Sequence, residues 1–160
     1  MWKIRLRWLL GALAALSVAM QLVPYGHSTN PPIRQEPAWD SPSTRDLAVR
    51  ACYDCHSNQT VWPWYAWIAP ISWLIRSDVD EGRGKLNFSE WDRPQREARR
   101  AGTQVQRGAM PPWYYTLMHA PANLSPGERQ SLVRGFDTTL APDRSRSTQA
   151  EKRTVKKTEG

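Results

Sequence analysis

The chain has only two cysteines, and they lie three positions apart in the run Cys52-Tyr53-Asp54-Cys55-His56. A disulfide between such close residues would close a tiny, strained loop of little stabilising value. The C-x-x-C-H spacing instead matches the pattern of covalent haem attachment. Two thiols one helical turn apart can reach neighbouring vinyl groups on a porphyrin edge, and the histidine that follows can bind the iron. We therefore predict one covalent haem c, with thioether bonds at Cys52 and Cys55 and with its iron bound by His56.

Zinc binding and thiol–disulfide exchange are the alternatives for this pair. A structural zinc site needs four ligands, and outside the motif the chain has only His27 and His119, with no second pair at metal spacing. A redox pair would have its first cysteine at a helix N-terminus within a βαβ unit. No strand pattern flanks these cysteines, so the sequence favours haem over both alternatives.

Met110 is the candidate for the axial position on the other side of the iron. It follows the helix-ending Gly108 and precedes Pro111-Pro112, so its loop cannot be helical and can lie across a haem. A thioether ligand favours ferrous iron and suits a reversible electron carrier. Met118 and His119 form a second possibility, and simple packing is the structural alternative for Met110.

The chain has nine tryptophans against two phenylalanines. Trp62, Trp64 and Trp73 follow the cysteine motif and are predicted to cover the haem edge, where they would exclude water and tune the redox potential. Ordinary core or surface packing is the alternative for each of them. A small domain with few large aliphatic residues also needs another apolar mass to bury, and a haem would supply it.

A basic segment and an apolar run begin the chain. Residues 1–7 carry three basic side chains and no acid, and the apolar run that follows continues to Val23. We predict that residues 1–7 are a cytoplasmic flank and that residues 8–25 are a transmembrane signal anchor. A cleaved signal peptide is the alternative, because Ser17 and Ala19 form a small-x-small pattern. In both cases the remainder of the chain is exported.

The formal net charge of +7 is concentrated at the two ends of the chain. Residues 1–7 and 141–160 each carry an excess of three positive charges, so the body is nearly neutral and a nucleic-acid partner is not indicated. Residues 26–42 are rich in proline and form either a spacer that lifts the domain off the membrane or a strap laid over it. We assign residues 43–140 to the haem-binding domain and residues 141–160 to a disordered basic tail.

Helical periodicity predicts an all-α domain of short helices joined by long loops. The four expected helices begin at capping residues or near prolines, at Ser43, Pro70, Asp92 and Ser125. The second is expected to end at Gly82 and Gly84. The residues expected to face inward are Leu47, Ala48, Ala51, Ile71, Leu74, Ile75, Val79, Ala98, Ala101, Val105, Leu132, Val133 and Phe136.

Further motifs surround the cysteines along the chain. They are Asn30-Pro31-Pro32, residues 36–42, 52–58 and 62–65, Ile68-Ala69-Pro70, Ser72-Trp73, residues 86–91, Met110-Pro111, Leu117, His119, Pro121, Leu124 and Ser125. In these features residues 20–137 resemble the small bacterial haem-binding domain family that is related to cytochrome c. The resemblance implies a cytochrome c-like haem domain behind an N-terminal anchor, with the Met-Pro element in the distal-ligand position. The Arg-rich stretch 93–107, which is poor in apolar residues, departs from the family.

These features together predict single-electron transfer at the outer face of a bacterial cytoplasmic membrane, with the haem domain on the periplasmic side. A membrane-bound or periplasmic redox protein is the expected partner, since a tether raises its effective concentration. A carrier is favoured over an enzyme. One alternative is a haem enzyme or a gas or peroxide sensor with an open distal site, with His119 as its acid–base residue. Another is a haem-bearing docking subunit of a larger oxidoreductase.

Overall fold

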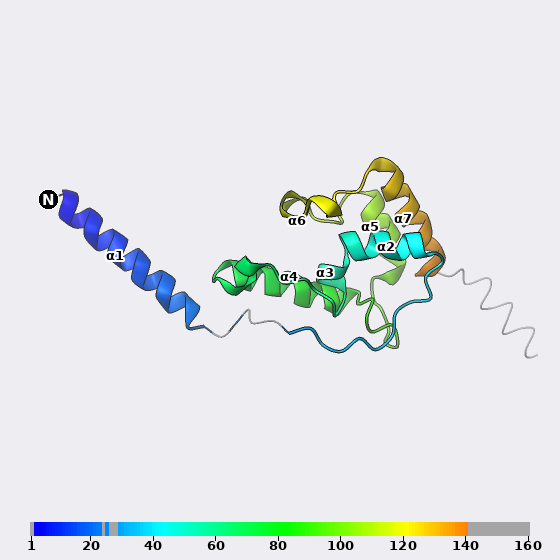
Figure 1. The fold of residues 1–160 in the computed structure, drawn as a ribbon, viewed down its shortest axis with the longest axis horizontal. Coiled ribbons are helices and arrows are strands. Elements are labelled where there is room, and N and C mark those ends of the chain that lie inside the picture. The colour runs from blue at the N-terminus through cyan, green and yellow to red at the C-terminus, as the bar shows by residue number, and fades with distance from the viewer. Residues whose placement is uncertain (1, 24, 26–28, 141–160) are drawn as a thin grey trace, which may run out of the picture.

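The computed structural model describes residues 2–23, 25 and 29–140, and these residues form helices and loops without a β-strand (Figure 1). The α-helices are α1 (Trp2–Gln21), α2 (Pro42–Ala51), α3 (Tyr53–His56), α4 (Ile71–Lys85), α5 (Ala101–Gln106), α6 (Trp113–Met118) and α7 (Pro126–Thr139). The 3-10 helices are η1 (Trp64–Trp67), η2 (Ala98–Arg100) and η3 (Ala120–Ala122). The predicted all-α fold is confirmed. His27 and the basic tail at 141–160 lie outside the described residues.

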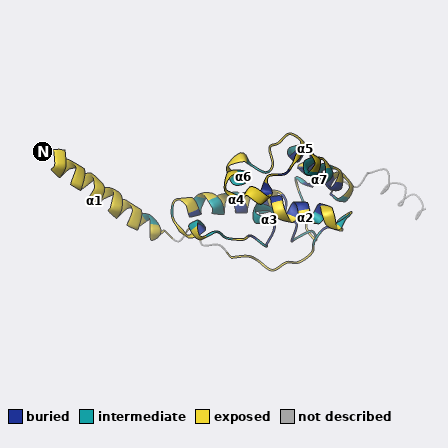
Figure 2. Cartoon of the chain, turned by 45° about the horizontal axis from the view of Figure 1, so that its top comes forward, coloured by how far each residue is buried: buried dark blue, intermediate teal, exposed yellow. Residues whose placement is uncertain are grey.

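Helix α1 stands apart from the rest of the fold, and its residues are almost all exposed (Figures 1 and 2). It is 20 residues long, and by length and composition it can cross a membrane, a test that signal sequences also pass. The helix begins at Trp2 and therefore includes the basic flank. Its last residue contacts the domain through its side chain. The Nε2 atom of Gln21 donates to the Ala69 carbonyl at 3.1 Å, and its Oε1 atom accepts from the Ala69 backbone amide at 3.0 Å.

The core lies between α2, α3, α5 and α7. Helices α5 and α7 pack closely, and the most deeply buried side chains between the elements are aliphatic and aromatic. Leu132 and Phe88 are fully buried, and Val105 and Phe136 nearly so. Phe88 is the centre of an aromatic cluster, with ring centroids 5.3 to 6.4 Å from those of Trp39, Tyr53, Trp91 and Phe136.

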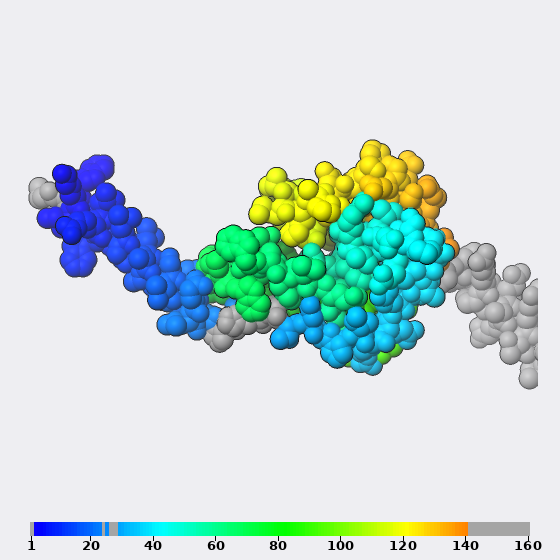
Figure 3. All heavy atoms as spheres, in the orientation of Figure 1, coloured from blue at the N-terminus to red at the C-terminus, as the bar shows by residue number. Residues whose placement is uncertain are grey.

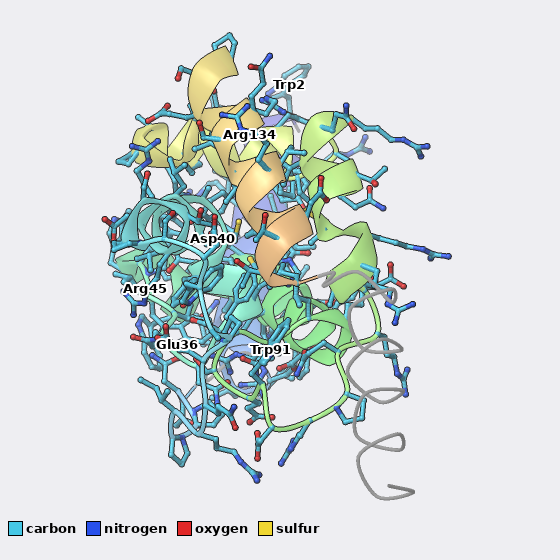
Figure 4. All side chains as sticks on the ribbon, turned by 90° about the vertical axis from the view of Figure 1, so that its right-hand side faces the viewer. Trp2, Glu36, Asp40, Arg45, Trp91 and Arg134 are labelled. Carbon is cyan, nitrogen blue, oxygen red and sulfur yellow. The ribbon has the colours of Figure 1, made fainter. Side chains whose placement is uncertain are left out.

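Residues 29–41 form a strap along the domain. The amides of Arg34 and Gln35 donate to the Ser89 carbonyl, and Trp91 donates back to Gln35 at 2.9 Å. Glu36 accepts two hydrogen bonds from the guanidinium of Arg45 on α2, at 2.7 and 2.8 Å, and this hydrogen bonding lowers the pKa of Glu36 (Figure 4). This segment therefore packs against the helices.

The last predicted helix is confirmed in detail. Ser125 caps α7, its hydroxyl accepts from the Glu128 amide, and the Glu128 carboxylate accepts from the Ser125 amide in a full capping box. The third predicted helix begins later than expected. The turns after Asp92 give way to η2 only at Ala98, and the expected inward residues of η2 and α5 are buried. The Arg-rich stretch thus packs through its small residues while its arginines remain on the surface.

Two further predictions about helix bounds are wrong. Helix α2 is capped by Ser41, with Pro42 as its first residue, because the Ser41 hydroxyl accepts from the Thr44 amide. Helix α4 does not stop at its glycines but continues to Lys85. Its predicted apolar face is also only partly buried, since Val79 is 1% exposed while Leu74 is 69% exposed.

Candidate functional site

Cys52 is the joint between α2 and α3. Its backbone leaves the helical region, with φ −131° and ψ −30°, and the chain then makes the single turn of α3. The amides of Cys55 and His56 both donate to the Cys52 carbonyl, at 3.2 and 2.9 Å. The two cysteines and the histidine are therefore held on one backbone turn.

The His56 ring is oriented by the C-terminal end of α4. Its Nδ1 atom lies 3.1 Å from the carbonyl oxygen of Gly82 and 3.0 Å from that of Leu86. Because carbonyl oxygens only accept hydrogen bonds, Nδ1 carries the proton and the lone pair is on Nε2. Burial also lowers the pKa of His56, which favours the neutral ring. A neutral imidazole with a free Nε2 is the form that binds iron.

Gly82 allows α4 to approach the motif so closely. A Cβ atom at this position would lie 2.4 Å from the Cys55 carbonyl oxygen, well inside van der Waals contact. The glycine that was expected to end the helix instead provides the space that brings a carbonyl to His56. Nothing in the local pattern distinguishes this use of glycine from a helix stop.

Two adjoining cavities lie beside the motif. The larger, of about 420 Å³, and the smaller, of about 140 Å³, are both lined by Cys52, His56 and Met110. Cys55 lines the smaller one. The larger is within the size range of ligand sites, and its walls include buried apolar side chains of the core. The structure thus brings together the two predicted attachment cysteines and both predicted iron ligands.

Met110 reaches these cavities through the turn that follows α5. Gly108 adopts a positive φ of 71°, a conformation that favours glycine, and the chain reverses there. The amides of Ala109 and Met110 then donate to the Gln104 carbonyl at 3.0 and 3.3 Å. The turn therefore holds Met110 at the cavity wall, and Met110 is 37% exposed.

The alternative axial candidates line another cavity. Met118 and His119 border a space of about 510 Å³ that Cys55 also lines but that His56 does not. The His119 ring stacks on Tyr115 with a centroid distance of 4.1 Å, and its Nδ1 lies 3.1 Å from the Tyr115 carbonyl oxygen. The geometry thus favours Met110 over these two residues as the partner of His56.

The three tryptophans predicted to cover the cofactor do not line the two cavities that contain His56. The Trp62 indole donates to the side chain of Asn30, and Trp64 is 76% exposed. Trp73 is half-buried, and its Nε1 has no hydrogen-bond partner. Their assignment as haem-covering residues therefore has no support from the cavity linings.

Phe88 and Lys85 are site residues that the sequence reasoning did not single out. Phe88 lines the larger cavity and lies edge-on to the His56 ring at 6.5 Å. Lys85 lines both cavities and pairs with Glu81 one helical turn earlier. The signal for Phe88 was its place between the buried Leu86 and the partly buried Trp91, which becomes visible only once the segment 86–91 is folded against the strap.

The environment of the cysteines differs from that of a dithiol redox centre. Burial raises the pKa of both Cys52 and Cys55 to about 12, so both thiols are protonated. Activated redox cysteines have a lowered pKa instead. Within residues 2–23, 25 and 29–140, no three His, Cys, Asp or Glu side chains are grouped so that they could hold a metal ion. The described residues therefore offer no zinc ligand set.

A model of the haem-binding domain family matches residues 15–138 of the chain. The chain belongs to this family. As a member of the haem-binding domain family it takes haem as its ligand, and the matched segment contains both cysteines, His56 and Met110. No curated protein and no solved structure matches the chain.

The chemistry of the donor set fits this cofactor. A neutral imidazole with a free Nε2 and a thioether side chain line the same two cavities, and both are iron ligands in electron-transfer haem proteins. Apolar walls such as Phe88 suit the porphyrin face. Two protonated thiols beside them suit addition to haem vinyl groups.

Proposed function

We propose that this haem-binding domain attaches haem covalently through Cys52 and Cys55 and carries single electrons at the outer face of a bacterial cytoplasmic membrane. The observation that carries the proposal is that both cysteines, His56 and Met110 converge on two adjoining cavities. Haem supplies reversible one-electron exchange between ferric and ferrous iron. Helix α1 would hold the domain at the membrane surface, where redox partners are concentrated.

His56 would bind the iron through its Nε2 atom. The Gly82 and Leu86 carbonyls hold the proton on Nδ1 and orient the ring, so the lone pair that would bind iron is on Nε2. Hydrogen bonding of Nδ1 to carbonyl oxygens also raises the basicity of the ligand nitrogen. The C-terminal end of α4 would therefore determine both the orientation and the protonation state of the His56 ring.

Met110 would be the second protein ligand of the iron, because it lines the same two cavities as His56. Its turn is held by hydrogen bonds from the Ala109 and Met110 amides to Gln104, and Pro111 and Pro112 prevent the segment from continuing as a helix. A soft thioether raises the reduction potential. Phe88 and Phe136 line the larger cavity together with Met110 and would exclude water from it. The exclusion of water would also raise the reduction potential.

Absorption spectra of Met110→Ala and Met118→Ala test this proposal, with both variants made in the full chain. Met110→Ala should lose the near-infrared methionine–iron band and should bind CO rapidly when reduced. Met118→Ala, which removes an exposed methionine from the other cavity, should keep the wild-type spectrum. A wild-type protein that binds CO rapidly would contradict the carrier and support an open-site enzyme or gas sensor.

A further inference from the structure

The end of the domain nearest α1 carries a concentration of exposed apolar side chains. Residues 61–75, which include η1 and the start of α4, contain no charged residue, and neither do residues 108–118, which include α6. Both stretches contribute walls to the cavity of about 510 Å³, whose lining also includes Asp54 and Asp78. The exposed residues that define this apolar end are Trp64, Ile71, Leu74, Trp113, Leu117 and Met118.

The exposure of this apolar end is high for side chains of this size. Trp64 and Trp113 are each 76% exposed, and Leu117 is 74% exposed. Isolated exposed apolar residues are common, but a contiguous patch on a protein surface marks an interaction site. Ile71 and Leu74 on α4 were predicted to be buried, but both are exposed. The described residues therefore leave an apolar stripe of α4 uncovered.

The apolar end is joined directly to α1. The two hydrogen bonds between Gln21 and Ala69 attach the last residue of α1 to the loop between η1 and α4. In Figure 3 the end of α1 lies beside η1 and the start of α4, and α6 lies on the same end of the domain. In Figures 1 and 2 as well, the start of α4 and helix α6 both lie on the side of the domain that faces α1. These contacts place the apolar end beside the end of the anchor.

Helix α1 also sets the height of the apolar end relative to a bilayer. At about 1.5 Å per residue, the part of α1 that follows the basic flank, residues 8–21, rises about 21 Å, which is less than the roughly 30 Å of the hydrocarbon core. The end of α1 therefore lies no farther out than the outer interface when the basic flank stays at the inner one. If α1 crosses the membrane, Gln21 emerges at the outer interface, and the apolar end lies at the same level. Tryptophan is the residue type enriched at this interface, because its ring is apolar and its N–H is polar.

We propose that the apolar end of the domain docks into the outer interface of the bilayer that holds α1. The inference rests on the proposed membrane anchoring and does not depend on the cofactor. The bilayer is the favoured occupant because α1 already places the apolar end beside it and because the stretches 61–75 and 108–118 carry no charge. The carboxyl groups of Asp54 and Asp78 line the cavity between the stretches, so docking involves the outer apolar side chains and leaves these two groups away from lipid. Docking turns a simple tether into a fixed orientation of the domain.

Photo-crosslinking from lipid tests the proposal. The full chain with its haem is placed in nanodiscs of phosphatidylethanolamine and phosphatidylglycerol that contain a lipid with a diazirine near its glycerol backbone. Labelled peptides are then identified by mass spectrometry. We expect labelling at the end of α1, in residues 61–75 and in residues 113–118, and only background labelling in α2 and α7.

Paired surface variants provide the control. Leu74→Ser with Leu117→Ser replaces one exposed residue on each wall and should reduce labelling of residues 61–75 and 113–118 to the background of α7. Ile33→Ser with Val49→Ser replaces two exposed apolar residues outside the apolar end and should leave the labelling unchanged. An unchanged absorption spectrum in both double variants would show that the domain is still folded.

The outcomes separate this inference from the proposal on which it rests. Labelled α1 with an unlabelled apolar end would overturn interfacial docking while leaving the anchor intact. If α1 is also unlabelled, the proposed anchoring fails as well. An apolar end that is unlabelled in pure lipid but crosslinks to a protein in native membranes would replace the bilayer with a protein partner.

Discussion

Replacement of Gly82 by alanine is the perturbation for which the structure gives the clearest expectation. A glycine-to-alanine change inside a helix ordinarily stabilises by up to about 1 kcal/mol. At Gly82 the new Cβ would lie 2.4 Å from the Cys55 carbonyl oxygen, 3.0 Å from its carbonyl carbon and 3.1 Å from its Cβ. The obstacle is backbone on an adjacent helix, so it cannot rotate away, and α4 must move.

The size of that movement sets the magnitude. Real Cβ contacts do not fall below 3.0 Å, so α4 must retreat by at least about 0.6 Å, the difference from 2.4 Å. Overpacking of this kind costs about 1–3 kcal/mol. Set against a propensity gain of up to about 1 kcal/mol, the expected result is a net loss of roughly 1–2 kcal/mol in the free energy of unfolding. The Gly82 carbonyl would also move away from Nδ1 of His56.

Gly84 provides a matched control in the same helix. A Cβ at Gly84 would meet nothing within 4 Å, so Gly84→Ala should be neutral or stabilise by up to about 1 kcal/mol. Thermal unfolding of the full chain in detergent, followed by far-ultraviolet circular dichroism, measures both variants. At roughly 4 °C per kcal/mol, Gly82→Ala should melt several degrees below the wild type and Gly84→Ala at or above it. A Gly82→Ala protein as stable as Gly84→Ala would refute the packing argument.

Two further expectations concern polar contacts. The Tyr115 hydroxyl donates to the Asp54 carboxylate at 2.6 Å, so Tyr115→Phe should destabilise by about 1–2 kcal/mol in thermal unfolding, whereas an unchanged melting temperature would show that water replaces the hydroxyl. The Arg50 guanidinium, followed by the Ser125 amide and hydroxyl, lowers the pKa of Glu128 from 4.5 to about 2. Because the folded-state pKa is the lower one, this contribution to stability is present above about pH 4.5 and is lost as the pH falls toward 2. As the pH falls from 4.5 to 2, the free energy of unfolding of Glu128→Gln should therefore decrease less than that of the wild type. An equal decrease in both proteins would argue against the contact.

Local chemistry allowed the sequence to predict the confirmed parts of the fold. The capping box at Ser125 and Glu128 involves residues three apart, and helix α7 follows from it. Gly108 and the prolines after Met110 likewise define a turn through short-range constraints. These features need no knowledge of distant residues, so they can be read from a single sequence.

Long-range packing explains what the sequence did not predict. Position 82 needs glycine because the backbone of Cys55, 27 positions earlier in the chain, lies against it. In the sequence, a glycine that ends a helix looks the same as a glycine that allows such a close contact. Trp39 enters the core because the strap folds back onto Phe88. The exposure of Leu74 follows from the absence of a packing partner on its side of α4 among the described residues. Helical periodicity identifies an apolar stripe but does not say what covers it.

The central claim is that haem is bound through two thioethers at Cys52 and Cys55. The most direct test is the intact mass of the full chain after maturation in a host that attaches haem, combined with alkylation of the denatured protein. The account predicts a mass increased by one haem and no alkylation at either cysteine. A colourless protein with two alkylated cysteines would contradict it.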